Sequence, residues 1–468
     1  MEVDVTQFFI GGTYKHKSFD NLRKVCQNWW PQIQKDPEGK SQYIIETFPG
    51  TTSFGSTPGT SSRGMHQHGE ELYIVIDTSL YRVDEYGSYT SLGTISGGNR
   101  CVFASVGTSL IIVANGNAYE WDGSTLTQGT DTDLGSPNTV TGLNSQAIYD
   151  FGSGQTFSVS NAGDYLNINA LNYGSAEVQG DDLVAPYEFQ QQLRLFGKRT
   201  TETWFNTGVG NPPFERTQGA SFNVGLGSRY GITNTVNNLY FFGHDNHVYV
   251  IDQNRPVPVS TPPMVREISE YQTTEDAVMY VMDYMDQHLI VVNFPAEGKT
   301  WVLQEGGEWF NLSSSDSNWI GDAYAYCYGK HLVADPNGDI YELDHDTYTD
   351  NGTTIKRVLQ SSPIHSGIAG KPGKRLELTS LTVELTTGQG LTSGQGSSPR
   401  LMMSISENGG RSFGTEYWYN LGVTGKYRES VKFSGLGGNS DSRVIKLELS
   451  DPIYCSIHGV TADVEVGI

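Results

Sequence analysis

Cysteine is scarce in this chain of 468 residues: only Cys26, Cys101, Cys327 and Cys455 occur, and no two of them form a CxxC pair. This sparse set argues against a zinc site and against a disulfide framework, and it suits folding in a reducing cytoplasm. No segment approaches the roughly 18 apolar residues that a membrane-spanning helix needs. The N-terminus, MEVDVTQFFIGG, is acidic where a signal peptide would be basic. We therefore expect a soluble protein without a cleavable export signal.

Positive charge is also in short supply, since the formal net charge is −22 and the isoelectric point about 4.8. Between Cys101 and Leu193 there is no Lys or Arg at all. A surface of this kind repels polyphosphate, which disfavours a protein that grips DNA. The tract is either an ordinary solvated surface or a wall past which a polyanion moves without sticking. Its ten acids are Glu120, Asp122, Asp131, Asp133, Asp150, Asp164, Glu177, Asp181, Asp182 and Glu188.

Motifs of the common enzyme classes are missing: there is no GxSxG elbow, P-loop, Rossmann fingerprint or HExxH. His66 and His68 are followed by Glu70 and Glu71 and resemble part of a metal site, but no third histidine has a suitable spacing. Asp335–Asp339 resembles a calcium loop without its closing Glu, so we interpret it as a hairpin turn. We expect no catalytic, cofactor-binding or metal-binding residues and no enzymatic activity. Paired carboxylates for sugar cleavage remain an open alternative among 52 acids.

What the chain does contain is an approximate repeat of paired apolar strands. Gly (55 residues) and Tyr (26 residues) are abundant, which is typical of an all-β protein with many turns. Equivalent positions at Tyr73, Ile111, Leu195, Tyr240, Ile290 and Val333 are separated by 38, 84, 45, 50 and 43 residues, and a weaker copy at 156–171 falls in the longest gap. This period predicts a β-propeller of six or seven blades.

Changes in texture divide the chain into three parts. We expect an N-terminal arm at 1–50, a propeller at 51–355 with a loop-rich acidic insertion around 131–190, and a C-terminal β-sandwich-like domain at 356–468. We also expect the arm to pack with the C-terminal domain. Val265–Met285 is the best helix candidate, with its Met and Tyr residues in the core. Trp29-Trp30 either anchors an interface or packs on the chain's own core. Ser406–Phe413 resembles an Asp-box turn, with Asn408 in the usual Asp place.

The most distinctive stretch is Gln192–Arg216, QLRLFGKRTTETWFNTGVGNPPFER. We expect Trp204, Phe205 and Phe214 to pack between blades, and Glu202 to pair with Arg199 at the surface or in a turn. With the sequence that follows, this stretch resembles the packaged-DNA stabilisation or tail hub (nozzle) family of short-tailed bacteriophages. The matching features are Phe196-Gly197-Lys198, Thr201–Trp204, Asn206–Gly208, Pro213-Phe214, Gly219-Ala220, the upstream 175–183 and the downstream Val259–Thr261.

The resemblance implies a structural virion protein of the phage tail that is made and assembled in the host cytoplasm. Six copies would form a ring below the portal and adaptor, with the C-terminal domain facing the adaptor. That ring would extend the DNA channel, retain packaged DNA without sequence-specific binding, and anchor tailspikes, fibres or a needle. The alternatives are a glycan-binding or glycan-cleaving propeller and a cytoplasmic interaction propeller without a viral role.

Overall fold

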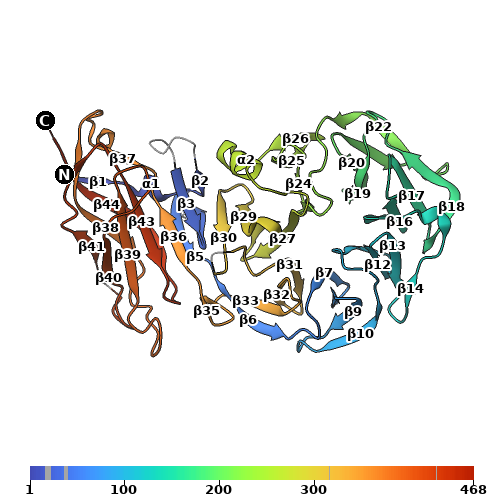
Figure 1. Ribbon diagram of the computed structural model, residues 1–468, viewed down its shortest axis with the longest axis horizontal. Coiled ribbons are helices and arrows are strands. Elements are labelled where there is room, and N and C mark those ends of the chain that lie inside the picture. The colour runs from blue at the N-terminus through green and yellow to red at the C-terminus, as the bar shows by residue number, and fades with distance from the viewer. Residues whose placement is uncertain (16–22, 36–40, 316, 428–429, 468) are drawn as a thin grey trace.

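The computed structural model describes residues 1–15, 23–35, 41–315, 317–427 and 430–467. A ring of blades forms one end of the molecule, and a β-sandwich that contains both termini forms the other (Figure 1). The protein is therefore all-β, with a propeller and a sandwich as predicted. Among the described residues, no helix is long and apolar enough to cross a membrane.

Within the described residues the propeller has seven blades of four antiparallel strands; five are separate sheets, and the sixth and seventh continue into larger sheets. The first blade contains β7 (Ser62–His68), β8 (Glu71–Ile76), β9 (Ser79–Val83) and β10 (Tyr89–Thr94); the second contains β11 (Val102–Val106), β12 (Ser109–Ala114), β13 (Asn117–Trp121) and β14 (Leu126–Gln128); the third contains β15 (Val140–Leu143), β16 (Gln146–Asp150), β17 (Thr156–Asn161) and β18 (Asp164–Ser175). The fourth blade contains β19 (Leu183–Phe189), β20 (Gln192–Gly197), β21 (Thr201–Asn206) and β22 (Phe214–Phe222), and the fifth contains β23 (Ile232–Asn234), β24 (Leu239–Phe242), β25 (Val248–Asp252) and β26 (Arg255–Pro258). The sixth blade contains β27 (Val278–Tyr284), β28 (Gln287–Phe294), β29 (Lys299–Gln304) and β30 (Trp309–Leu312), and the seventh contains β31 (Ala323–Cys327), β32 (Lys330–Ala334), β33 (Ile340–Asp344) and β6 (Gly50–Gly55).

The ring is closed by a strand from the beginning of the chain. β6 is the outer strand of the seventh blade and pairs antiparallel with β33, so that Thr51 lies opposite Leu343. The backbone groups of β33 that would otherwise form an open edge are thereby paired. Residues about 290 positions apart in sequence are thus joined in one sheet, and the propeller is complete only with the N-terminal segment present.

The second strand of each blade is buried on both faces because neighbouring blades cover it. All six residues of β12 are buried, and Leu193, Leu195 and Phe196 of β20 are at most 1% exposed. Strands covered on both sides show continuous apolar runs in place of alternation. This is why the repeat is visible in the sequence as short, uninterrupted hydrophobic segments.

Region 131–190 does not form the projecting insertion that its composition suggested. It contains the short 3-10 helix η1 (Thr132–Leu134), the whole third blade and the first strand of the fourth. Small polar residues lie inside the strands here: Ser158 and Ser160 of β17 are fully buried, and Ser160 Oγ accepts a hydrogen bond from Ala147 N. The composition of this region therefore suggested a loop, whereas its serines are hydrogen-bonded inside the third blade.

The structure also differs from the helix expected at Val265–Met285. A helix, α2 (Pro262–Ser269), precedes the sixth blade, and the Met-rich part forms the inner strand β27. A short apolar run buried on both faces has no periodicity that separates strand from helix. The predicted core role holds for Met279, Met282 and Tyr284, whereas Met285 is half exposed in a turn.

The sandwich consists of two sheets that both include N-terminal strands. The first contains β4 (Trp29–Lys35), β5 (Ser41–Thr47), β44 (Ser456–Val466), β38 (Leu376–Leu385) and β41 (Val431–Ser434), with β1 (Glu2–Asp4) and β42 (Asn439–Ser440) at its sides. The second contains β3 (Arg23–Gln27), β36 (Arg357–Gln360), β43 (Ser442–Leu449), β39 (Arg400–Ser406) and β40 (Glu416–Asn420), with β2 (Tyr14–Lys15) and β37 (Ile364–His365). Short elements complete the chain: α1 (Thr6–Phe9), η2 (Pro295–Glu297), β34 (Thr349–Asp350), β35 (Thr353–Thr354) and η3 (Ser366–Ala369).

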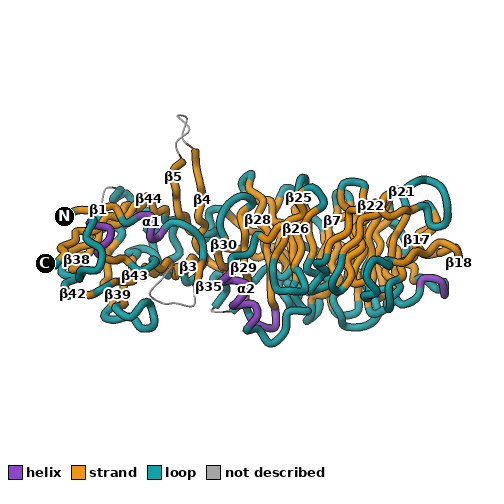
Figure 2. The backbone as a smooth tube through the Cα atoms, turned by 90° about the horizontal axis from the view of Figure 1, so that it is seen from above, coloured by secondary structure: helices purple, strands orange, loops and turns teal. Residues whose placement is uncertain are grey.

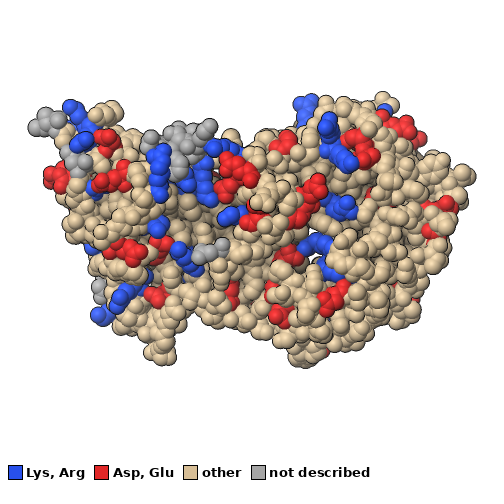
Figure 3. All heavy atoms as spheres, in the orientation of Figure 1, with Lys and Arg blue, Asp and Glu red and all other residues tan. Residues whose placement is uncertain are grey.

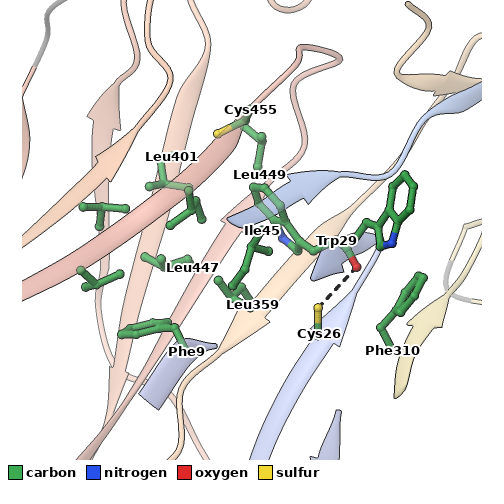
Figure 4. Packing of buried hydrophobic residues seen from close by; sticks show 14 of the residues in the cluster. Phe9, Cys26, Trp29, Ile45, Phe310, Leu359, Leu401, Leu447, Leu449 and Cys455 are labelled. Carbon is green, nitrogen blue, oxygen red and sulfur yellow. Dashed lines mark hydrogen bonds between the residues drawn. The ribbon is translucent and has the colours of Figure 1, made fainter. Parts of the chain in front are cut away.

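Propeller and sandwich share one sheet and one hydrophobic core. β3 pairs with β30 of the sixth blade on one side and with β36 of the sandwich on the other. Trp29 is fully buried beside Phe310 of the sixth blade, and the same cluster continues through Leu359 to Leu447 (Figure 4). The tryptophan pair therefore packs on the chain's own core, and the two parts of the molecule form one unit.

β4 and β5 form a two-stranded hairpin, here called the arm hairpin, that leaves the body of the molecule. Seven residue pairs join the two strands, from Trp29 opposite Thr47 to Lys35 opposite Ser41. Only Ile45 and Glu46 of β5 also pair with β44. Figure 2 shows the arm hairpin standing out on the side opposite α2.

Candidate functional site

The innermost strand of each blade lines a central channel of about 730 Å³. These strands are β7, β11, β15, β19, β23, β27 and β31, and all seven run in the same direction along the channel. The two openings are therefore built differently: one lies among the starts of the inner strands, and the other lies among the tight turns that follow them.

The opening at the strand starts is held by an ion pair between two blades. Arg100, just before β11, contacts Asp322, just before β31, with 2.5 Å between Nη1 and Oδ2. Arg100 Nη2 also donates to the Asp322 carbonyl, and Asn293 donates to the other carboxylate oxygen. In Figure 3, basic and acidic side chains lie next to each other around this opening. The Asp322 carboxylate is therefore engaged by Arg100 and Asn293.

Further along the channel, His66 and His68 of β7 both contact the Ser105 hydroxyl of β11. The distances to Ser105 Oγ are 3.0 Å from His66 Nε2 and 2.9 Å from His68 Nδ1. His68 Nε2 lies 3.1 Å from the Thr108 carbonyl, which only an N–H group satisfies, so Ser105 donates to His68 Nδ1 when His68 is neutral. Burial lowers the pKa of His66 to about 4.

The carboxylates of the His66–Glu71 segment do not join these histidines. Glu71 accepts hydrogen bonds from Tyr73 Oη and Arg82 Nη1. Over the described part of the chain, no three His, Cys, Asp or Glu side chains are grouped closely enough to hold a metal ion. The structure therefore assigns these histidines to a hydrogen-bond chain between the first two blades.

The second opening lies on what we call the turn face, formed by the turns after the inner strands at 69–70, 107–108, 144–145, 190–191, 235–238, 285–286 and 328–329. The arm hairpin stands on this side of the molecule (Figure 2). Asn144-Ser145, Gln190-Gln191 and Met285-Asp286 are turn pairs in which both residues have positive φ. Such turns favour Asn-Gly, and a side chain in the left-handed region costs about 1–2 kcal/mol. On the opposite face, Asp77, Asn115 and Asn246 are the non-glycine residues with positive φ at blade turns.

Exposed apolar side chains follow the same division. Tyr86 is 81% exposed and Val236 is 78% exposed, and Val209, Met285 and Tyr326 are also at least about half exposed. All five lie on the turn face. Within the described residues, no large exposed apolar side chain lies in a turn of the opposite face. Leu171 and Tyr173 of the outer strand β18 are also more than half exposed. Exposed apolar side chains mark surfaces that contact other proteins, so the turn face is a candidate docking surface.

Most acids of the tract without Lys or Arg have structural partners. Asp150 accepts hydrogen bonds from the backbone N–H groups of Asn138 and Thr139. Asp181 accepts from Arg199 N and Thr200 N, and Asp131 accepts from Ile168 N in addition to its role at the start of η1. Much of this negative charge therefore stabilises turns, which is a local reason for its presence.

The Gln192–Arg216 stretch forms strands β20, β21 and the start of β22. Trp204 packs edge-on against Phe157 of the third blade with 5.4 Å between ring centroids, and Phe214 is 4% exposed, so both pack between blades as predicted. Phe205 is 41% exposed and does not. The expected pairing of Glu202 with Arg199 is wrong: Glu202 is buried and accepts hydrogen bonds from Val178 N and Trp204 Nε1.

Two turns expected from their residue types are present. Asp335 Oδ1 accepts hydrogen bonds from the backbone N–H groups of Asn337, Gly338 and Asp339, which makes this segment a hairpin turn. Asn408 Oδ1 likewise accepts from Arg411 N and Ser412 N in the Asp-box-like loop. Both side chains accept hydrogen bonds from the backbone of their own turns and thereby stabilise them.

The fold and these motifs agree with the comparisons to known families. Residues 6–348 match the family described as "Bacteriophage P22 Gp10, beta-propeller". Residues 364–465 match "Bacteriophage P22 Gp10, beta-sandwich". The chain belongs to the bacteriophage P22 Gp10 family. Membership confirms the family expected from Gln192–Arg216 and makes the protein a structural component of a phage tail.

Solved structures with similar folds are distant in sequence. A streptogramin B lyase is 12% identical with a TM-score of 0.45, and the match covers 63% of this chain and 97% of that one. The WD40 propeller of Doa1 is 10% identical with a TM-score of 0.41, covering 64% and 97%. A virginiamycin B lyase from Staphylococcus aureus is 10% identical with a TM-score of 0.45, covering 64% and 98%. A search of curated protein sequences finds no match.

Proposed function

We propose that this protein is a homohexameric tail hub that extends the DNA channel below the portal and adaptor of a phage. The single observation that carries the proposal is the match to the P22 Gp10 family over both the propeller and the sandwich. In this role the hub retains packaged DNA, gives tailspikes, fibres or a needle a place to dock, and has no enzymatic activity. Assembly takes place in the host cytoplasm.

The distribution of charge supports this role. Residues 51–355 contain 12 Lys and Arg against 36 Asp and Glu, whereas the rest of the chain contains 18 against 16. Each Lys or Arg that contacts a phosphate adds a salt-sensitive attraction. An acidic propeller near the channel therefore lets double-stranded DNA slide, while the nearly neutral sandwich is free to contact the adaptor.

The carboxylates along the propeller channel support a structural role over glycan cleavage. Asp322 is paired with Arg100, Asp283 contacts His288, and Glu188 accepts a hydrogen bond from Gln191 N. A glycosidase needs one carboxylic acid and one carboxylate that both reach the sugar. Side chains that already have partners within the protein are poorly placed for that chemistry.

Assembly on the portal–adaptor complex tests the proposal. The purified chain should be monomeric or weakly associated, and adding the portal–adaptor complex should produce a stable ring, measured by mass photometry. Electron cryomicroscopy of the tail should then place this chain below the adaptor with sixfold symmetry. Tight binding of double-stranded DNA by the lone chain at about 150 mM salt would contradict the proposal. Release of reducing ends from host polysaccharide would favour the glycan-cleaving alternative instead.

A further inference from the structure

A small cavity lies on the turn-face side, where the arm hairpin, the propeller and the sandwich meet. Its volume is about 10 Å³, which is the space of one water-sized group. Three separate parts of the chain contribute to its walls, so the cavity exists only in the folded molecule. The lining residues are Trp30, Glu46, Thr47, Pro49, Tyr284, Met285, His345, Tyr348 and Tyr454.

Four aromatic side chains form much of the wall. The rings of Trp30 and Tyr284 have centroids 5.9 Å apart, and those of Tyr348 and Tyr454 are 6.2 Å apart. Aromatic faces attract cations through the ring quadrupole, most strongly where water is excluded. Met285, which is 50% exposed, belongs to the rim and leaves the cavity reachable from outside.

Two polar groups of the wall, the Tyr284 hydroxyl and the Glu46 carboxylate, supply acceptor oxygens. The Tyr284 hydroxyl is buried and makes no hydrogen bond within the described residues, and the residue as a whole is only 4% exposed. The Glu46 carboxylate, on the strand next to Trp30, is partly buried and interacts electrostatically with His345, which also lines the cavity. A buried polar group without a partner is unfavourable, so the Tyr284 hydroxyl, with the Glu46 carboxylate beside it in the wall, suits a ligand that donates N–H groups.

The surroundings are electronegative. Burial is the main cause that raises the pKa of Tyr284, and the negative charges of Asp344 and Asp346 add to it. Burial also raises the pKa of Glu46, and His345 opposes this effect. Arg357, the basic group that stacks on Tyr348, is turned to backbone carbonyls of Ile355, Phe48 and Tyr348. A cation in the cavity would therefore meet the negative charge of Glu46, Asp344 and Asp346, and the basic side chain among the lining residues is His345, with no Lys or Arg among them.

We propose that this cavity binds a primary ammonium group, the head of a lysine side chain from a protein that docks on the turn face. An ammonium group is close to water in size and carries three N–H donors, which suit the Glu46 carboxylate and the Tyr284 hydroxyl. A planar guanidinium group is too large for the space. A free ammonium ion has the same chemistry, so the test must separate the two sources.

The test uses the full chain labelled with 5-fluorotryptophan, with the Trp30 resonance identified by the variant Trp30→Phe. Chloride salts of n-butylammonium, ammonium, potassium and ethylguanidinium are titrated at constant ionic strength while the fluorine spectrum is recorded. We expect n-butylammonium to shift the Trp30 resonance in a saturable way and to leave the Trp418 resonance unchanged. Potassium and ethylguanidinium should have no saturable effect.

Variants connect the shift to the cavity. Glu46→Gln should weaken n-butylammonium binding about tenfold, and Tyr284→Phe should weaken it severalfold, because each removes one acceptor. Glu465→Gln, on the exposed end of β44, is the matched control and should bind as the parent does. If only ammonium chloride shifts Trp30, the site takes the free ion and the lysine proposal is wrong. An equal response to potassium, or no saturable shift with any salt, would also overturn it, since the cavity would then hold a metal ion or only water.

Discussion

The propeller and the part formed by the arm and sandwich differ sharply in charge, although they share one core. Residues 51–355 have a threefold excess of acids over bases, with 36 against 12, whereas the remaining residues are balanced at 16 against 18. Because β3 joins both parts in one sheet, the acidic half is held in a fixed position relative to the neutral half. The difference teaches that acidic and balanced surfaces can be separated on one molecule that has a continuous core, as the proposed division between DNA avoidance and partner contacts requires.

The largest effect should come from breaking the connection between the halves. Trp29→Ala removes a fully buried side chain from the shared core and should cost about 3–5 kcal/mol of unfolding free energy. Chemical denaturation followed by tryptophan fluorescence measures this, and the parent should unfold in one transition. Trp418→Ala is the control, because Trp418 is 57% exposed and its loss should matter little. Two separate transitions in the parent protein would show that the halves are not one unit.

Within the propeller, the next effect should come from the ion pair at the channel opening. Arg100→Ala leaves the Asp322 carboxylate, whose side chain is 8% exposed, without its cation and should cost about 2–3 kcal/mol. Urea denaturation near neutral pH measures the loss. Arg82→Ala, which breaks the half-exposed pair with Glu71, should cost less than about 1 kcal/mol. Equal losses of unfolding free energy in the two variants would mean that burial does not strengthen the contribution of the Arg100–Asp322 pair.

A smaller effect should appear when the pH falls, and it should arise in the propeller. The pKa of His66 is lowered to about 4 because burial disfavours its charged form, while an unfolded histidine has a pKa near 6.5. The contribution is present above about pH 6.5 and is lost as the pH falls toward 4, because the unfolded chain then binds the extra proton. We expect His66→Gln to reduce the loss of stability between pH 7 and pH 5 by up to about 2 kcal/mol. His458→Gln, at an exposed strand position of the sandwich, is the matched control.

The smallest effect concerns DNA. Changing Asp133 and Glu177 of the tract without Lys or Arg to lysine should leave stability within about 0.5 kcal/mol and should increase binding of double-stranded DNA at low salt. Filter binding over a range of salt concentrations should show a slope steeper by about 2. The same double change at Glu416 and Glu465 of the sandwich is the control. If the control binds DNA equally well, the acidity of the tract has no role of its own.

Much of the fold could be predicted because it is encoded locally. The paired strands, the period near 40–50 residues and the turn at Asp335 depend on neighbours within one hairpin. Errors arose where burial overrode local appearance. Ser158 and Ser160 look like loop residues but are hydrogen-bonded inside a blade, and the run around Met279 looks helical because both faces of β27 are covered. Glu202 looked like a surface group because its partners, Val178 N and Trp204 Nε1, depend on how its blade folds around it.

The candidate site was less predictable still. Nothing in the residue types of Gln190-Gln191 or Met285-Asp286 indicates a left-handed turn, since such turns favour Asn and Gly. The turn face, the candidate docking surface, forms only when the fold brings seven turns from seven blades to one side. In the cavity, Glu46 and Tyr284 lie about 240 positions apart in sequence, and Tyr284 and Tyr454 lie about 170 positions apart. No local sequence pattern indicates that these residues meet.

The sequence by itself determined an all-β chain of repeated hairpins with a strongly acidic middle, and its Gln192–Arg216 motif determined the family. Only the tertiary structure decided the number of blades, the closure of the ring by β6, and the joining of propeller and sandwich through Trp29. Turn chemistry and strand patterning act over a few residues, so they can be recognised along the chain. Pairing of β6 with β33 and the shared core arise between segments hundreds of residues apart, where the buried area gained on packing selects the partner.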